Sequence, residues 1–210
     1  MGQMQRNIWL VLFSMLLLAI PAYFYREQLF LFLAFSAKAQ GSYASELMVP
    51  IAKYGPVLLA LVLLLLVIFN RKTPIRRRLT VLVSPLVAWG INRICKSLFQ
   101  EVRPCEALSF ESAIPCPHSP LDWSFPSGHS AIAAGLAVAC ILLWKKIWPL
   151  AIALAFLFGY GRVAVGVHYV HDVLVGWVIG AAFTIICCQG FLFLWAKITS
   201  DRPNTKITAP

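Results

Sequence analysis

The chain has 210 residues, of which 60% are hydrophobic and only 12% are charged. An average soluble domain is about 45–50% apolar and about 25% charged, so this composition excludes an ordinary soluble domain and predicts a membrane protein. The formal net charge of +10 raises the alternative of a nucleic-acid-binding protein. Since most of the cations flank apolar runs, we predict the lipid bilayer as a partner and no nucleic acid.

Six stretches of the chain contain no Asp, Glu, Lys or Arg. They are residues 7–25, 54–70, 79–92, 123–144, 147–161 and 173–196. A spanning helix needs about 20 predominantly apolar residues, so we expect the short runs 79–92 and 147–161 to continue as helix past the arginine that ends each. The sequence therefore predicts an all-α fold, a six-helix transmembrane bundle. Residues 1–200 would form a single integral membrane domain, and residues 201–210 a disordered cytoplasmic tail.

Two segments between the apolar runs have their own character. Residues 27–40 (EQLFLFLAFSAKAQ) show helical apolar periodicity but are too short to span, which predicts an amphipathic helix lying in the membrane interface. The loop from residue 99 to 125 contains four prolines, which disfavour regular structure.

The charged residues divide unevenly between the two sides that six alternating helices would define. Eleven cations fall on the side of the termini. They are Arg6, Arg71, Lys72, Arg76, Arg77, Arg78, Lys145, Lys146, Lys197, Arg202 and Lys206. Cytoplasmic loops collect Lys and Arg. We therefore predict a multi-pass protein of the cell inner (plasma) membrane with both termini in the cytoplasm. The opposite side, with seven of the eight acidic residues, would face the periplasm or the extracellular space.

Two cysteines, Cys105 and Cys116, lie in the outer loop within RPCEALSFESAIPCPHSP. The outer compartment is oxidising enough to keep a disulfide between them. A zinc site with His118 as a third ligand is the alternative, but the spacing favours the disulfide.

The first polar block is KSLFQEVRP, residues 96–104. Lys96 and Arg103 are seven residues apart, two helical turns, so we expect them to share a helix face that Pro104 then ends. Two cations directed at one point form an anion site, in which Arg binds two oxygens. The alternative is a pair of cations whose charged ends reach out of the membrane at a helix end.

The second block is PSGH, residues 126–129, at the mouth of an apolar helix. Gly128 allows close approach of the backbone to a ligand. Ser127 and Gly128 would lie in the first helical turn, where free N–H groups favour an anion. The block therefore predicts a phosphate site with His129 beside it. The alternative is an ordinary helix cap followed by an incidental histidine.

The third block is RVAVGVHYVHD, residues 162–172. His168 and Asp172 are one helical turn apart, so the carboxylate would hold one ring nitrogen protonated and leave the other as a nucleophile. Arg162 supplies a further cation, and His171 lies on another face without an evident role. The alternative is a structural ion pair at the start of the last helix.

In this order and spacing, Lys-x6-Arg-Pro, Pro-Ser-Gly-His and Arg-x5-His-x3-Asp resemble the three-part signature of the type 2 phosphatidic acid phosphatase superfamily. The resemblance covers about residues 53–196, and the apolar composition favours the branch of membrane lipid phosphatases. One departure is Gly161, where the family often has Ser before the arginine.

The resemblance implies the role of each residue. His168 would be the phosphoryl-accepting nucleophile oriented by Asp172, and His129 would protonate the leaving group and then activate water. The phosphate pocket would consist of Lys96, Arg103, Arg162, Ser127 and Gly128. No metal and no cofactor are expected, and the active site would lie at the outer membrane face.

The substrate implied by the resemblance is a membrane lipid phosphate. The compact length of the chain and its segment VGVHYVHDVLVG are similar to those of bacterial undecaprenyl diphosphate phosphatases. This similarity favours hydrolysis of a polyprenyl diphosphate through a phosphohistidine. Phosphatidylglycerophosphate or phosphatidate hydrolysis is the first alternative. A non-catalytic lipid-binding or transport protein with a vestigial site is an alternative of another class.

Overall fold

The structure is a computed structural model that describes residues 3–39, 42–117 and 122–200. Within them the chain forms helices and loops and no strand, which confirms the predicted all-α fold. The helices are α1 Gln3–Phe24, α2 Arg26–Ala39, α3 Ser42–Phe69, α4 Ile75–Phe99, α5 Pro104–Ala107, α6 Gly128–Leu143, the 3-10 helix η1 Lys145–Ile147, α7 Trp148–Ala164 and α8 Val170–Ser200. The predicted tail at residues 201–210 lies outside the described residues.

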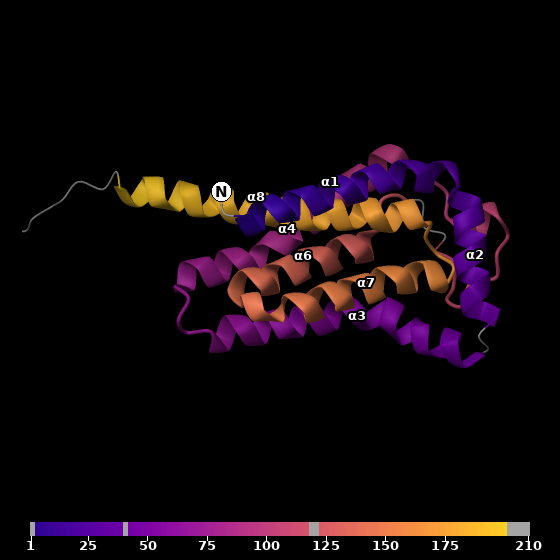
Figure 1. Ribbon diagram of the computed structural model, residues 1–210, viewed down its shortest axis with the longest axis horizontal. Coiled ribbons are helices and arrows are strands. Elements are labelled where there is room, and N and C mark those ends of the chain that lie inside the picture. Colours follow the sequence, from indigo (N-terminus) through magenta and orange to yellow (C-terminus); the bar gives the residue numbers. More distant parts are fainter. Residues whose placement is uncertain (1–2, 40–41, 118–121, 201–210) are drawn as a thin grey trace, which may run out of the picture.

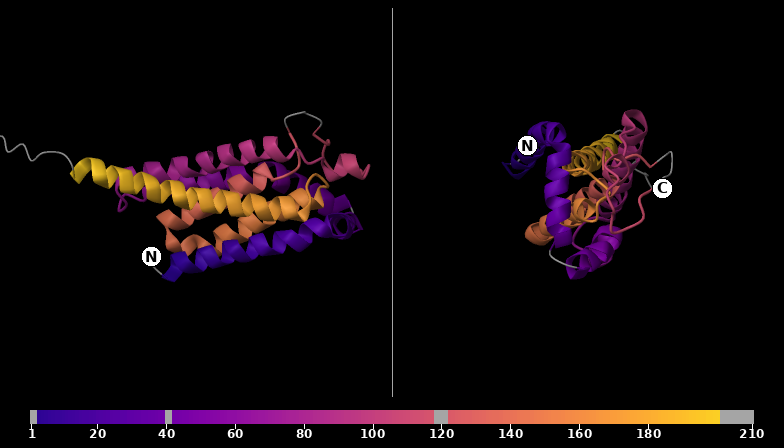
Figure 2. Two further views of the ribbon diagram at one scale, coloured as in Figure 1. Left: turned by 90° about the horizontal axis from the view of Figure 1, so that it is seen from above. Right: turned by 90° about the vertical axis from the view of Figure 1, so that its right-hand side faces the viewer.

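The long helices run side by side in a bundle, and α2 lies across one end of it (Figures 1 and 2). The α4–α6 connection and the α7–α8 turn lie at that same end (Figure 1). The N-terminal part of α1, the α3–α4 loop and η1 lie at the opposite end, where α8 extends beyond the bundle. The basic loops and the polar blocks of the sequence therefore occupy opposite ends of the molecule.

The predicted bundle of apolar helices is confirmed, but not all six predicted spans meet the length and apolar composition typical of a membrane span. Among the described residues, four helices are long and apolar enough to cross a membrane, namely Arg6–Phe24, Leu47–Phe69, Lys145–Ala164 and Val170–Trp195. Helix α6 is apolar but has only 16 residues, because the proline-containing loop before it enters the bundle. Helix α4 has 25 residues, but cations at both of its ends lower its apolar character.

Both short apolar runs continue past their arginines, as predicted. Helix α7 runs through Arg162 to Ala164, and α4 runs through Arg93 to Phe99. Helix α4 ends at Phe99, where the predicted loop begins, but the expectation that Pro104 ends α4 was wrong. Gln100, with φ 50°, caps the helix in the left-handed conformation, and Pro104 is the first residue of α5. Proline suits that position because its missing N–H would be unpaired there anyway.

Helices α6 and α8 pack closely because small residues face each other. A Cβ atom at Gly180 would lie 1.9 Å from the carbonyl oxygen of Ala131, and one at Gly176 would lie 2.6 Å from the carbonyl oxygen of Ser127. Close approach through small residues is typical of helix pairs in membranes. It brings the beginning of α6 against the beginning of α8, which is where the second and third polar blocks lie.

Helix α2 and the loop between α4 and α6 cover the end of the bundle that holds the polar blocks. Phe30 of α2 is fully buried and contacts the rings of Phe110 and Tyr169 at 5.1 and 5.7 Å. A disulfide joins Cys105 to Cys116, which constrains the loop between α4 and α6. The predicted short helix at residues 27–40 is therefore present, and its inner face packs on the polar end of the bundle.

Candidate active site

The structure brings the three polar blocks together at the end of the bundle near α2. Lys96 is in the last turn of α4, Arg103 precedes α5, Ser127, Gly128 and His129 begin α6, Arg162 is in the last turn of α7, and His168 and Asp172 flank the start of α8. All of the cations, His168 and Asp172 are buried. Buried charge at membrane depth is costly, and its concentration in one place is typical of a functional site.

The hydrogen bonds of His168 define which ring nitrogen carries the proton. Its Nε2 atom lies 3.1 Å from Arg103 Nη1, and a guanidinium only donates, so Nε2 is the acceptor. Its Nδ1 atom lies 3.2 Å from Asp172 Oδ2, so Nδ1 carries the proton and donates to the carboxylate. The arrangement leaves the Nε2 lone pair directed into the group of cations.

The surroundings of His168 also keep its ring neutral. Burial, and then the positive charges of Arg103 and Lys96, hold the pKa of His168 well below its usual value. A neutral imidazole retains the lone pair that nucleophilic attack requires. The side chain is therefore suited to accept a phosphoryl group at Nε2.

Asp172 is held in place by several donors. Its Oδ2 atom accepts from the hydroxyl of Ser124 at 2.6 Å and from the backbone N–H of Tyr169 at 2.9 Å, in addition to His168. Ser124 was not identified from the sequence, although it stands two residues before Pro126 in the second block. These bonds favour the charged carboxylate, which would stabilise positive charge developing on His168.

Lys96 and Arg103 meet at one point, but not on one helix face as predicted. Arg103 lies beyond the end of α4 in extended backbone, with φ −72° and ψ 149°. Their common partner is Asp122, whose Oδ1 atom lies 3.0 Å from Arg103 Nη2 and 3.5 Å from Lys96 Nζ. Arg93 Nη1 is 4.0 Å from the same oxygen. The chain fold, and not helical periodicity, therefore brings these cations together.

Backbone carbonyl groups also hold these two cations. Arg103 donates to the carbonyl oxygens of Val167 at 2.8 Å and Asp122 at 2.9 Å, and Lys96 donates to the carbonyl oxygen of Trp123. The Asp122 carboxylate, with 37% of its side chain exposed, is the more accessible partner. Partial burial raises the pKa of Asp122, but Arg103 and Lys96 outweigh it and hold the pKa below its usual value.

The Pro-Ser-Gly-His turn joins the start of α6 to α8. Ser127 caps α6, and its hydroxyl oxygen accepts from the N–H and the hydroxyl of Ser130 at 3.4 and 2.9 Å. The Ser127 N–H donates to the carbonyl oxygen of Asp172 at 3.0 Å. Gly128 lies near Asn92 and Trp89 of α4, at ordinary contact distance for a Cβ atom. Ser127 therefore has a capping role here, and its contact with phosphate stays a prediction.

His129 and Arg162 complete the site with unused donors. The ring of His129 has no hydrogen-bond partner among the described residues, and it lies within electrostatic range of Arg162 and Arg103. Arg162 Nη1 donates to the carbonyl oxygen of Ala52 at 3.3 Å, whereas its buried Nε atom has no partner in the part of the chain that the structure describes. Gly161, in place of the family's serine, packs against Ala52 of α3.

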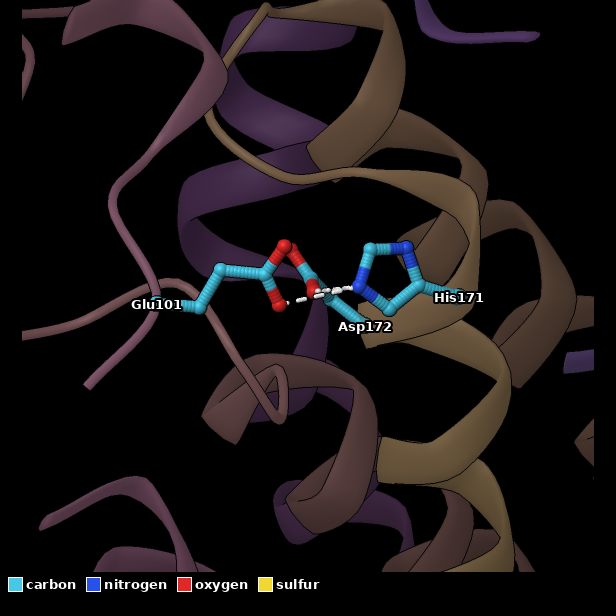
Figure 3. A group of neighbouring side chains, drawn as sticks. All are labelled: Glu101, His171 and Asp172. Atoms are coloured by element: carbon cyan, nitrogen blue, oxygen red, sulfur yellow. Dashed lines mark hydrogen bonds and ion pairs between the residues drawn. The ribbon is translucent and has the colours of Figure 1, made fainter. Parts of the chain in front are cut away.

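Glu101, His171 and Asp172 form a second polar group (Figure 3), which shares Asp172 with the pair that His168 makes. In the part of the chain that the structure describes, they are the three residues whose ligand-type atoms lie within 4.8 Å of one another. His171 had no evident role from the sequence, and Glu101 was not singled out there as a candidate residue. The sequence distance between Glu101 and the third block does not predict their contact, because only the fold of the α4–α5 connection brings Glu101 next to His171.

Comparison with known proteins places this site in a family. Residues 77–196 match the PAP2 superfamily, and this range contains every predicted catalytic and phosphate-binding residue. The chain belongs to the PAP2 superfamily. The match confirms the resemblance seen in the three sequence blocks and shows a multi-pass membrane protein of a phosphatase family.

Curated relatives are similar over most of their length. The chain is 34% identical to an undecaprenyl-diphosphatase of Sulfolobus acidocaldarius over 163 residues, which is 77% of this chain and 73% of that protein. It is 33% identical to undecaprenyl-diphosphatase BcrC of Bacillus subtilis over 153 residues, 72% of this chain and 74% of the relative. Two proteins named undecaprenyl-diphosphatase are therefore similar to this chain over more than 70% of its length.

A solved PAP2 structure has the same fold. The transmembrane PAP2-type phosphatidylglycerolphosphate phosphatase of Bacillus subtilis superposes with a TM-score of 0.66 at 25% identity, covering 88% of this chain and 96% of the other. The arrangement of helices around the candidate site is therefore that of a membrane phosphatase.

Proposed function

We propose that the protein is a membrane lipid phosphatase that hydrolyses undecaprenyl diphosphate to undecaprenyl phosphate and inorganic phosphate. The observation that carries the chemistry is the pairing of His168 Nδ1 with Asp172, which leaves Nε2 unprotonated beside Arg103. The similarity to two undecaprenyl-diphosphatases over more than 70% of the chain supports the choice of lipid.

In the first step, His168 Nε2 attacks the terminal phosphorus of the lipid diphosphate. A bond forms between Nε2 and phosphorus while the bond from phosphorus to the bridging oxygen breaks. His129 gives a proton to the departing lipid phosphate. Asp172 stabilises the imidazolium character that develops on His168, in the way that carboxylates support histidines in other hydrolases.

In the second step, water hydrolyses the phosphohistidine. His129, now neutral, takes a proton from the water, whose oxygen bonds to phosphorus as the bond to Nε2 breaks. The products are inorganic phosphate and the original site. Throughout both steps Lys96, Arg103 and Arg162 offset negative charge on the phosphoryl oxygens, which is the main electrostatic requirement of such a transfer. Protein cations would supply this charge, so we propose that no metal or cofactor takes part.

The orientation that we propose places the site at the outer face of the inner (plasma) membrane, with both termini in the cytoplasm. The support is the separation of charge along the bundle, with the basic α3–α4 loop and η1 at the end opposite the site (Figure 1). Positively charged loops are retained on the cytoplasmic side. The diphosphate head group would then be hydrolysed in the outer leaflet.

A glycerophospholipid phosphate is the second candidate substrate. The structural likeness to a phosphatidylglycerolphosphate phosphatase favours it, because the same pocket chemistry would bind a phosphomonoester. The two candidates share every catalytic step and differ only in the leaving group.

The test is phosphate release by the purified protein in detergent, with undecaprenyl diphosphate, phosphatidylglycerophosphate and phosphatidate as separate substrates. We expect preference for the diphosphate, and loss of all release in His168→Ala. Preference for a glycerophospholipid, lost in the same variant, would keep the mechanism and replace the substrate. Equal release by wild type and His168→Ala would contradict the assigned nucleophile.

A further inference from the structure

His171 is fixed rigidly behind the proposed catalytic pair. Its side chain is 2% exposed, and its ring is stacked between the rings of Phe125 and Tyr169 at 5.5 and 5.6 Å. Tyr23 contacts it edge-on at 5.2 Å. The plane and position of the ring are therefore determined by packing from three sides.

The fixed ring places one nitrogen between two carboxylates (Figure 3). His171 Nε2 lies 3.0 Å from Glu101 Oε2 and 3.2 Å from Asp172 Oδ1. A carboxylate oxygen is an acceptor, so Nε2 must carry a proton to make either contact favourable. Asp172 Oδ1 is buried and accepts no hydrogen bond among the described residues. The His171 N–H, which donates to Glu101 Oε2, lies 3.2 Å from Asp172 Oδ1 and attracts it electrostatically.

Glu101 reaches Asp172 by two routes. Its side chain contacts His171, and its backbone carbonyl accepts from the N–H of Ser124 at 2.7 Å, whose hydroxyl in turn donates to Asp172 Oδ2. Arg26 Nη1 of α2 lies 3.6 Å from Glu101 Oε1. Arg26 of α2 therefore offsets the negative charge of Glu101. Glu101 is linked to Asp172 Oδ1 through His171 and to Asp172 Oδ2 through Ser124.

We propose that His171, supported by Glu101, is a positioning residue for the Asp172 carboxylate. This proposal rests on the function proposed for His168 and Asp172. The His171 N–H attracts Oδ1 electrostatically from 3.2 Å, which restrains rotation of the carboxylate and keeps Oδ2 directed at His168 Nδ1. That contact in turn keeps the proton on Nδ1 and the lone pair on Nε2, so His171 acts on the reaction through Asp172 and touches no substrate.

Two substitutions separate the hydrogen bond from the packing. His171→Phe keeps a flat ring between Phe125 and Tyr169 but removes the N–H. His171→Gln keeps an N–H donor near the position of Nε2. We expect kcat to fall about tenfold or more in His171→Phe at nearly constant KM, as loss of a hydrogen bond to a charged group implies. His171→Gln should recover most of that loss, which a purely structural role for the ring does not explain.

A second measurement reads the tautomer of His168 without any substrate. In protein labelled with 15N-histidine, we expect His168 to be protonated at Nδ1 in the wild type and partly at Nε2 in His171→Phe. We expect His171 itself to be protonated at Nε2 in the wild type. If the wild type hydrolyses none of the tested lipids but shows these tautomers, the proposed function fails and the positioning role stands.

Three results would overturn the proposal. One is His171→Phe with unchanged kcat and unchanged His168 tautomer. Another is a wild-type His171 protonated at Nδ1 alone, a result that requires no variant to fold. The third is a shift of the His171 signals on addition of zinc ions that EDTA reverses, with activity dependent on zinc, because Glu101, His171 and Asp172 would then be ligands of a metal.

Discussion

Gly180 offers a direct test of the packing that assembles the site. An alanine Cβ there would lie 1.9 Å from the carbonyl oxygen of Ala131 and 2.7 Å from its carbonyl carbon. The obstacle is backbone of α6, which no side-chain rotation can move away. The substitution Gly180→Ala therefore requires α6 and α8 to separate before the methyl group fits.

The magnitude follows from two opposing effects. Overpacking of a tight interface costs about 1–3 kcal/mol, and a backbone obstacle favours the upper end of that range. Alanine is a better helix former than glycine by about 0.5–1 kcal/mol, which leaves a net loss of about 2 kcal/mol. For a chain of this size, that loss corresponds to a melting temperature lower by about 4–8 °C.

Activity should fall as well, because the start of α6 carries His129. A displacement of about 1 Å at a catalytic group costs about a hundredfold in rate. We therefore expect Gly180→Ala to lose more activity than the loss of folded protein at the assay temperature accounts for.

The assay is thermal unfolding of the purified protein in one detergent, followed by tryptophan fluorescence and combined with phosphate release. Gly190→Ala on the same helix is the matched control, because a Cβ there meets nothing within 4 Å and should leave stability unchanged or slightly higher. A Gly180→Ala protein as stable and active as the Gly190→Ala control would refute the close contact of α6 with α8.

Three further predictions concern the pocket and the outer loop. Asp122→Asn should lower the inhibition constant of orthovanadate about fivefold, since it removes a competing ion pair worth about 1 kcal/mol. Glu106→Gln, an equal change of charge in the same connection, should leave that constant unchanged. Weaker inhibition of Asp122→Asn by orthovanadate would mean that the carboxylate helps to form the pocket. Mass mapping of the unreduced protein should find Cys105 bonded to Cys116, and replacing both by Ser should cost about 2–4 kcal/mol of stability; two free thiols in the mature protein would contradict the bond. Phosphate release should persist in excess EDTA, and full loss that magnesium restores would show that the protein cations alone do not supply the required charge.

Much of the site could be predicted because its residues are adjacent in sequence or one turn apart. His168 and Asp172 are four residues apart and lie in contact in the structure. The same reasoning failed for Lys96 and Arg103, since α4 ends at Phe99 and only the loop that follows returns Arg103 to the site. Helical periodicity predicts contacts between residues of one helix, but it does not predict contacts made by residues beyond the end of that helix.

The sequence by itself determined the helical runs, the two ends of different charge and the residue types available to the proposed site. These follow from composition, since apolar length decides which segments enter a membrane and residue type decides the chemistry available. The tertiary structure alone decided that Asp122 pairs with Lys96 and Arg103 and that His171 contacts both Glu101 and Asp172. Such contacts join residues up to 70 positions apart, from Glu101 to His171, so their formation depends on how α4, α6 and α8 pack and not on any local pattern.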